Sequence, residues 1–445
     1  MDFILNKDTT LSDELLVKML TKSQADRARY KKLEDYYLGK NIILKRVMAD
    51  SNKPNNKIAD PFASYITDTL CGYFVGEPIT YNSLDEEALD ALNQTLIYND
   101  TADVDMELAR TVSIYGRAYE LHYIDADGAN RFSLVKPIDM DIVRDDSLEN
   151  DILYAIRKVP QYDILTNKTT YKIELYNAET VKVYTTNETM SAVSFVSEDP
   201  HYYGMVPVVE YINNEQKLGD FEQVISLIDA YDKLESDSLN DFESFTDAYL
   251  VLTGLTADSD DIAAMRENRV LLLDEDSSAE WLVKSTNDAN IQNIKDRIQS
   301  DIHKFAKVPD LSDESFSGNT SGIAIKYKLY GTETLISTKE RKFMKGLQRR
   351  IELIFNILAL KGMVFDWRSI EINFTRNLPA NVNEIADIVQ KLSGAVSRET
   401  LLAQVPFITD VNAEMERLEQ DRERNPFYNL DIETAEDKVE VEEND

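Results

Sequence analysis

One cysteine, Cys71, is all that this chain of 445 residues contains, and long apolar runs are absent as well. A single thiol cannot form an intrachain disulfide, so the fold does not depend on an oxidising compartment. No stretch approaches the roughly 18 apolar residues of a membrane-spanning helix. The first residues, MDFILNKDTTLSDELL, carry acids where a signal peptide has a basic region. We therefore expect a soluble protein of the cytoplasm.

Positive charge is also scarce, because 48 lysines and arginines face 81 aspartates and glutamates, which leaves a net charge of −33. A protein that holds nucleic acid by neutralising its phosphates needs dense lysine and arginine. The balance argues against such a protein but leaves open one past which nucleic acid must slide. Since 43% of the residues are apolar, a chain of this length can bury a sizeable core.

Catalytic motifs are the third thing missing. His122, His201 and His303 fall in separate segments, with no second ligand or nucleophile at helical or hairpin spacing. The run Gly318–Gly322 lacks the Gly-Lys-Ser/Thr that completes a phosphate-binding loop. The run Asp125–Gly128 looks like the start of a calcium loop, but Lys136 stands where the bidentate glutamate must sit. The run is better interpreted as a hairpin turn that joins two strands. We expect no enzyme activity, no cofactor and no metal.

A metal-dependent nuclease is the alternative to weigh against this expectation. Such two-metal sites need several convergent carboxylates, and Asp139, Asp141, Asp145 and Asp146 lie close together in the sequence. In a chain with 81 acids, clusters of this kind arise by chance, so we favour a solvated loop. Cys71 sits in an apolar helical stretch without a base beside it, which predicts a core position.

Helical and strand periodicities alternate in blocks along the first half of the chain. Residues 11–48, 60–74 and 85–115 predict helices, the last a pair. From Gly116 the period changes to two, and polar turns separate six predicted strands, at 117–124, 131–135, 152–159, 170–176, 181–185 and 192–196. The strands predict an antiparallel meander, and the mixture of elements predicts an α+β fold.

The helical period returns at residues 214–247, where ten acids and only two lysines give a net charge of −8. At about 1.5 Å per residue, a helix of this length spans roughly 50 Å. A small α/β unit is expected next, with strands at 249–253, 269–273 and 280–283 and a helix at 259–267. A helix at 287–308 follows, with a narrow apolar stripe suited to packing on another helix.

A polar loop, 310–321, leads into a very long predicted helix at 322–360, which Gly362 closes. Between Gly322 and Arg350 this helix holds eight basic residues and two acids, a net charge of +6. We expect kinks at its interior glycines, Gly331 and Gly346. A strand at 369–374, short helices at 382–392, 398–404 and 411–423, and a disordered acidic tail at 431–445 complete the prediction.

Long helices need partners along their whole apolar stripe, and an isolated monomer does not supply them. Side-by-side packing of identical subunits in a ring does. The pattern therefore favours a ring.

Four blocks of sequence resemble, in the same order, the portal proteins of long-tailed bacteriophages of Gram-positive bacteria. The N-terminal block is Asn55–Phe62 (Asn-Asn-Lys-Ile-Ala-Asp-Pro-Phe) with Tyr65–Asp68 and Gly72–Pro78. The other blocks are Val206–Glu210, Ser317–Leu329, and Val396–Leu402 with Asp410–Leu418. They cover the chain from about residue 40 to residue 420, and four blocks in family order argue against chance similarity.

The resemblance implies a dodecameric ring at one vertex of the phage head, around a channel for double-stranded DNA. Residues 1–213 with the return strand 362–378 are then the wing, and helices 214–247 and 287–308 are the stem. The remaining parts are a small α/β clip at 248–286, a tunnel loop at 309–321, a long helix at 322–361, crown helices at 379–425, short for the family, and an acidic disordered tail at 426–445.

The resemblance also implies three sets of site residues. In the tunnel loop, which would contact DNA, they are Asp310, Asp313, Glu314, Ser315, Phe316, Ser317, Gly318 and Asn319. In the stem, where acids would form a wall repulsive to phosphates, they are Asp229, Asp232, Glu235, Asp237, Asp241 and Glu243. In the clip, which would dock other components, they are Asp258, Asp260, Asp261, Asp274, Glu275 and Asp276.

Partners and location follow from the same resemblance. The implied partners are further copies of this chain, double-stranded DNA, the terminase large subunit, the major capsid and scaffolding proteins and a head–tail connector or adaptor protein, with no membrane. The expected location is the portal vertex of the virion capsid, and the host cytoplasm during assembly. The basic patch 339–350 has two open interpretations, contact with acidic neighbours between subunits or contact with DNA. A phage-encoded hydrolase or nuclease and a non-portal acidic scaffold or adaptor remain alternatives.

Overall fold

The computed structural model describes residues 2–50, 53–244, 249–253, 278–282, 288–311, 327–376, 382–403, 405, 408 and 411–424. The chain divides into two compact units, one formed by residues 1–313 with 328–377 and the other by 314–327 with 378–445. The first unit combines helices and sheets, and the second contributes helices, which agrees with the predicted α+β class. The predictions for 259–273 and for the acidic tail fall outside the described residues.

The first helix, α1 (Asp13–Tyr37), is shorter than the predicted 11–48. Ser12 caps it, because its hydroxyl accepts the N–H of Leu15 at 3.3 Å. Gly39 follows the helix with a φ of +69°, a backbone conformation that glycine favours. The chain then continues as the 3₁₀ turn η1 (Ile42–Lys45) and an extended segment, so the basic stretch spans different elements.

Three further helices follow in the first unit. They are α2 (Phe62–Val75), α3 (Glu86–Tyr98) and α4 (Thr101–Tyr115), which confirm the helices predicted at 60–74 and 85–115. Residues of α2 and α4 belong to the same large hydrophobic cluster. Cys71 is part of it and is 2% exposed, so its predicted core position is confirmed. Burial raises the pKa of its thiol to about 12.

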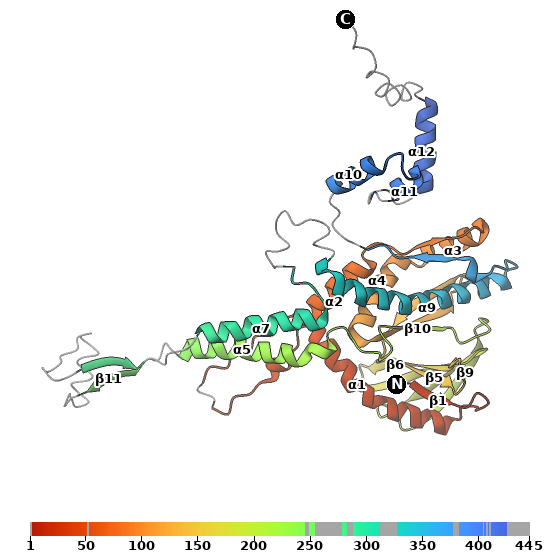
Figure 1. Ribbon diagram of the computed structural model, residues 1–445. Helices are drawn as coiled ribbons and strands as arrows, with labels where there is room; N and C mark the ends of the chain where they lie inside the picture. The colour runs from red at the N-terminus through yellow and green to blue at the C-terminus, as the bar shows by residue number, and fades with distance from the viewer. Residues whose placement is uncertain are drawn as a thin grey trace, which may run out of the picture. The chain divides into compact units, whose positions relative to one another are not determined.

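The larger sheet has six strands in the order β1-β5-β6-β7-β8-β9 (Figure 1). They are β1 (Asp2–Leu5), β5 (Met140–Asp145), β6 (Ile152–Asp163), β7 (Lys168–Tyr176), β8 (Thr180–Thr186) and β9 (Val193–Pro200). β1 pairs in parallel with β5, and every other pair is antiparallel. α1 packs on this sheet through a cluster that joins Leu16 and Leu20 to Val143 and Ile173.

A second, antiparallel sheet contains β10 (Val208–Ile212), β3 (Arg117–Ile124) and β4 (Asn130–Val135), in that order. The predicted single meander is therefore right for the strands from 152 onward and wrong for the first two, which pair in this other sheet. The turn between β3 and β4 is the predicted hairpin. Asp125 Oδ1 accepts the N–H of Ala129 at 2.8 Å, and Gly128 has a φ of +76°.

Strand β5 lies where the sequence predicts a solvated loop. Asp141 and Asp145 are 2% and 1% exposed, so that prediction is wrong for both. Asp141 is ion-paired with Lys158 at 2.9 Å, and Asp145 accepts the N–H groups of Ser147 and Asp151. Their charges are compensated inside the fold, which a count of acids along the sequence does not show.

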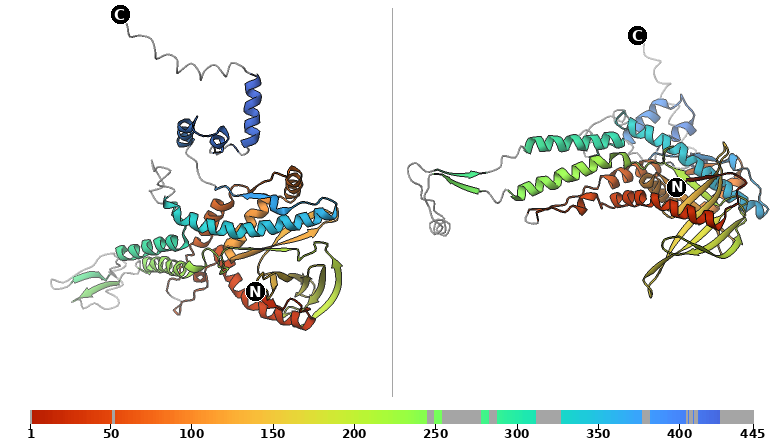
Figure 2. Two further views of the ribbon diagram at one scale, coloured as in Figure 1. Left: turned by 45° about the vertical axis from the view of Figure 1, so that its right-hand side comes forward. Right: turned by 90° about the horizontal axis from the view of Figure 1, so that it is seen from below.

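The acidic helix is α5 (Ile225–Ser244), preceded by the 3₁₀ turn η2 (Glu222–Val224). A helix from residue 214 is ruled out, because residues 214–221 are irregular and Lys217 has a φ of +55°. Gly219 approaches α4 so closely that a Cβ there would overlap the carbonyl of Ile114. The helix therefore measures about 30 Å rather than about 50 Å. Beside it runs α7 (Asp288–Ala306), close to the predicted 287–308 (Figures 1 and 2).

The long helix α9 (Tyr330–Leu360) is followed by Gly362 with a φ of +90°, as predicted for the end of this helix. Gly331 is its second residue, directly after a break in the helical backbone at Leu329, whereas the helix continues without interruption through Gly346, the other glycine at which the sequence predicts a kink. Gly346 has a packing role instead, because a Cβ there would overlap the ring of Tyr211. After the short 3₁₀ turn η5 (Trp367–Ser369), β13 (Glu371–Asn373) pairs with β2 (Thr80–Asn82).

Two strands predicted in the small α/β unit are present. β11 (Tyr249–Thr253) and β12 (Ser278–Leu282) pair with each other in antiparallel fashion. The second compact unit contains α10 (Val382–Leu392), α11 (Arg398–Leu402) and α12 (Val411–Arg424), which agree with the predicted short helices. None of the described helices has the length and apolar content needed to cross a membrane.

Candidate functional site

An extended segment after η1, residues 53–60, is bound along α5, and we call it the strap. Three of its backbone N–H groups donate to side chains spaced four residues apart on the helix. The pairs are Asp60 N–H to Asp232 Oδ1 (2.9 Å), Ile58 N–H to Ser236 Oγ (2.9 Å) and Asn56 N–H to Asn240 Oδ1 (2.7 Å). Two residues of extended chain advance by about 6.6 Å and four residues of helix by about 6 Å, so the two series stay in register.

The six predicted stem acids lie on α5. All of them, Asp241 included, interact with other groups of the chain, and five have the following partners. These partners are the Tyr36 hydroxyl for Asp229, Asn41 and the strap for Asp232, Lys295 for Glu235, Arg46 for Asp237 and Asn56 for Glu243. Asp232 is 0% exposed, which removes it from the acids available to a surface. Asp237, Asp241 and Glu243 keep exposed or half-exposed side chains.

Asp232 is the most perturbed of these carboxylates. Burial raises its pKa to about 6, and the nearby Asp60 and Asp229 carboxylates act in the same direction. Hydrogen bonds from the Asp60 N–H and from Asn41 Nδ2, the latter at 2.7 Å, favour the ionised form and oppose the rise. The strap is therefore fixed to α5 partly through a group that titrates near neutral pH.

Three further acids of the 214–247 stretch face basic residues of the same chain. Glu222 pairs with Arg29 at 2.6 Å, and Asp220 and Glu215 pair with Lys339 and Lys342 of α9. Both open interpretations of the basic patch 339–350 involve a partner outside this chain, either a neighbouring subunit or DNA. The structure adds a third, in which acids of the same subunit neutralise much of the patch.

Arg350, at the end of that patch, is completely buried. Its guanidinium pairs with Glu120 at 2.6 Å and with Asp105 at 2.7 Å. Burial opposes ionisation of Glu120, but Arg350 and His122 outweigh it and lower the pKa of Glu120 to about 2. His122 lies 2.8 Å from Glu120, so it belongs to this buried cluster.

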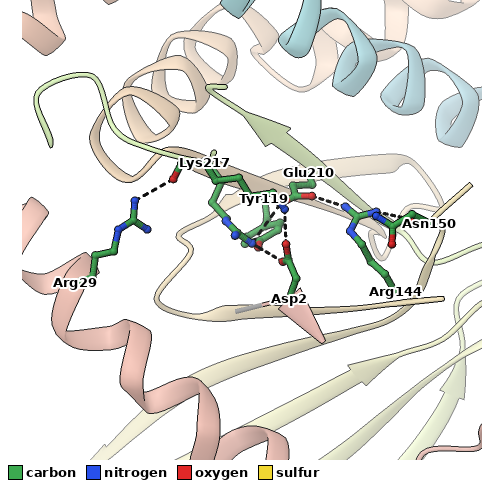
Figure 3. A network of polar contacts seen from close by, with 8 residues as sticks. Asp2, Arg29, Tyr119, Arg144, Asn150, Glu210 and Lys217 are labelled. Carbon is green, nitrogen blue, oxygen red and sulfur yellow. Dashed lines mark hydrogen bonds and ion pairs between the residues drawn. The ribbon is translucent and has the colours of Figure 1, made fainter. Parts of the chain in front are cut away.

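A second polar cluster ties the first strand of the chain to both sheets (Figure 3). Asp2 accepts from Arg117 at 2.5 Å and from Lys217, and Glu210 accepts from Lys217 at 2.9 Å and from Arg144. Burial opposes ionisation of Asp2, yet the two cations lower its pKa to about 2. The cluster fixes the irregular segment before α5 against strands β3, β5 and β10.

The segment after α7 is anchored at its first residues. Tyr65 donates its hydroxyl to the Pro309 carbonyl at 2.9 Å and accepts the N–H of Leu311 at 3.1 Å. Asp310 accepts from Gln299 Nε2 at 3.2 Å and lies 3.8 Å from His303. Asp310 is the first of the predicted tunnel-loop residues. The others, from Asp313 to Asn319, and all six predicted clip acids lie outside the described residues.

Two further observations bear on chemistry. His201 Nε2 lies 2.9 Å from the Asn177 carbonyl, and His303 packs edge-on against the rings of Phe62 and Tyr65. Within the part of the chain that the structure describes, no three histidine, cysteine or acidic side chains form a group suited to a metal ion. The described arrangement is one of compensated charges that hold helices in place.

Comparison with known proteins identifies the class. Residues 17–426 match the model of a family described as "Phage portal protein, SPP1 Gp6-like". The chain therefore belongs to this family of phage portal proteins, which are structural components of the virion capsid.

Individual relatives agree with that family. The portal protein of Bacillus phage SPP1 is 26% identical over 414 residues, which cover 87% of this chain and 82% of the relative. The portal protein of Clostridium phage phiCD119 is 22% identical over 426 residues, covering 88% of this chain and 93% of the relative. The resemblance to portal proteins inferred from four sequence blocks is confirmed.

Sequence reasoning missed the residues of α5 that hold the strap, Ser236 and Asn240. A signal was present, because Asp232, Ser236 and Asn240 recur every fourth residue and form a polar line on one face of an amphipathic helix. The first block of the resemblance, Asn55–Phe62, now has a structural explanation, since most of it is the strap.

Proposed function

We propose that twelve copies of this chain form a closed ring at one vertex of the capsid, and that double-stranded DNA passes through the ring during packaging and ejection. The observation that carries the proposal is the α5–α7 pair of a portal-family chain. It leaves Phe242, Ile294 and Phe305 exposed by 70%, 49% and 54%. Apolar side chains of this size lose stabilisation in water and gain it when neighbouring subunits cover them.

The parts of the subunit take the roles that the family resemblance implies. Residues 1–213 and 362–378 form the wing, α5 and α7 the stem, and 248–286 the clip. The other assignments are the tunnel loop at 309–321, the long helix at 322–361 and the crown at 379–425.

The stem presents a weakly adhesive wall to DNA. Asp237, Asp241 and Glu243 supply its negative charge, repeated in every subunit. Repulsion of phosphates lowers affinity and so reduces drag on the moving duplex. Asp232 stabilises the strap instead of contributing to this wall.

The clip completes its small sheet with strands of adjacent subunits, because the pair β11–β12 alone is marginal in water. Its acids, Asp258, Asp260, Asp261, Asp274, Glu275 and Asp276, then dock the terminase large subunit during packaging and the head–tail connector protein afterwards. The wing and crown contact the major capsid and scaffolding proteins. Assembly takes place in the host cytoplasm, and the chain performs no enzymatic step of its own.

Native mass spectrometry of the purified chain tests the ring. Closed rings are expected without added metal or nucleotide, with a mass of twelve subunits. A stable monomer at micromolar concentration contradicts the proposal and favours an acidic adaptor. A metal-dependent cleavage of DNA by the purified chain favours a nuclease.

A further inference from the structure

A half-open cleft of about 250 Å³ lies where the strap meets α2 and α7. Its walls include Asp60, Phe62 and Tyr65 on one side and Gln299, His303 and Asp310 on the other. The His303 ring is 6.1 Å from that of Phe62 and 5.5 Å from that of Tyr65, at interplanar angles of 77° and 84°. The cleft therefore combines aromatic surface with two carboxylates.

Two buried polar atoms of these walls have no hydrogen-bond partner in the described part of the chain, namely Asp60 Oδ2 and His303 Nδ1. Burial and the nearby Glu235 carboxylate raise the pKa of Asp60, although the charge of Lys295 acts in the opposite direction. A buried acceptor without a donor is costly, and more so when it carries charge. The cleft is thus suited to a ligand that donates hydrogen bonds and is positively charged.

An arginine side chain has both properties. Its planar guanidinium donates to carboxylates through several N–H groups and packs against aromatic rings. We propose that the cleft binds the side chain of Arg297 from a neighbouring copy of this chain. The inference rests on the proposed ring assembly and adds a specific contact to it.

The position of Arg297 on α7 favours it as the occupant. Residues of an α-helix are about 100° apart, so Arg297 lies about 160° around the helix from Gln299 and about 120° from His303. Arg297 is exposed, whereas His303 and Gln299 are half-buried in the cleft wall. One side of α7 therefore carries the cleft and the far side carries the cation. Contacts between two different patches of identical subunits form a ring when the rotation from one subunit to the next closes on itself.

The variant Asp60→Asn separates this role from a structural one. The backbone N–H of Asp60, which binds Asp232, is retained, while a buried charge is removed. The Tm of the unassembled chain, measured in solutions dilute enough to contain monomers, is therefore expected to stay the same or to rise. The concentration at which half of the subunits are in rings is expected to rise by roughly tenfold or more, as is typical when a desolvated charge pair loses one partner.

Arg297→Gln is expected to weaken assembly to the same extent, and the double variant no more than either single one, because both changes remove the same interaction. Asp90→Asn, an exposed acid of α3, is the matched control and leaves assembly unchanged. The inference is overturned if the effects of the two substitutions on ring assembly add in the double variant. It is also overturned if Asp60→Asn rings dissociate at the same subunit concentration as wild-type rings. Neither result contradicts the proposed ring. A wild-type chain that remains monomeric overturns both.

Discussion

The buried carboxylate of Asp232 accepts the backbone N–H of Asp60 at 2.9 Å, across 172 residues of sequence. This bond joins α5 to the strap and so to α2, which begins two residues later. Its acceptor has a pKa raised to about 6, so the stability of this attachment depends on pH and decreases as the carboxyl group ionises.

Asp232→Asn is expected to change that dependence. The pKa of Asp232 is raised from 3.8 to about 6 in the folded chain, so its contribution to stability is fully present below about pH 4 and is lost as the pH rises through 6. The variant cannot ionise at this position. It is therefore expected to become more stable than the wild type by roughly 1–2 kcal/mol as the pH rises from 4.5 to 7.5, after allowance for solvent screening. Thermal unfolding of both chains across this pH range measures the difference. If the stability of the two chains changes with pH in the same way, the prediction is contradicted.

Ser236→Ala tests the strap from the helix side. It leaves the N–H of Ile58 without its acceptor and is expected to cost about 1–2 kcal/mol. Hydrogen exchange at Ile58 is expected to quicken more than exchange in α4. Ser238→Ala is the matched control, because its hydroxyl bonds to the Leu234 carbonyl of its own helix. If the N–H of Ile58 exchanges at the same rate in both variants, the hydrogen bond from the strap to Ser236 is contradicted.

A pair of glycines in α9 offers an internal comparison. Gly346→Ala places a methyl group against the ring of Tyr211 and is expected to destabilise the chain by about 1–3 kcal/mol. Gly331→Ala meets open space and is expected to stabilise it by a few tenths to about 1 kcal/mol. Urea unfolding of both variants measures the change in the free energy of unfolding, which is expected to be a decrease for Gly346→Ala and an increase for Gly331→Ala. The packing explanation of Gly346 does not survive if both substitutions stabilise.

Asp2→Asn removes one of two carboxylates that face Arg117 and Lys217. We expect a loss of about 1–3 kcal/mol at neutral pH, because the cations keep only Glu210 between them. The pKa of Asp2 is lowered to about 2, so the loss is fully present above about pH 4 and disappears as the pH falls through 2. Asp8→Asn, on the exposed turn after β1, is the control. Unfolding curves at pH 7 and pH 3 distinguish the two variants.

The proposed tunnel loop is tested by crosslinks between adjacent subunits at Ser315→Cys and Ser317→Cys. Cys71 can stay in place, because its thiol is buried and its pKa is raised to about 12, which makes it a poor nucleophile. Crosslinked rings are expected to fail in DNA packaging or retention, and reduction of the crosslink is expected to restore both. Normal packaging by crosslinked rings shows that the loop is a passive connection.

The sequence predicts most helices and strands of this chain but not how its charges are arranged. Periodicity places α2, β3 and α10 within two residues of their ends, because each pattern reflects one buried face. It fails at β5 and at residues 214–221 for different reasons. In β5 the acids are buried beside a partner such as Lys158, 17 residues away, and at 214–221 the close approach of Gly219 to α4 prevents a helix.

The same limit applies to the candidate site. A count of ten acids in 214–247 predicts a repulsive surface, whereas Asp220 and Glu222 are neutralised by Lys339 and Arg29. Partners that lie more than a hundred residues away cannot be found from local composition. The strap could be suspected only from the polar residues of α5 at every fourth position, since its own contribution consists of backbone N–H groups and one side-chain amide, that of Asn56.

The strap runs antiparallel to α5, since Asp60 meets Asp232 while Asn56 meets Asn240. This direction has a mechanical consequence. A force that slides the strap along the helix loads all three N–H bonds at once, so they resist together. A force that lifts the strap from its Asn56 end strains one bond at a time, and each opens before the next is loaded. The attachment therefore resists shear better than peeling, and peeling from the Asn56 end must also break the bonds of the Asn56 side chain to Asn240 and Glu243.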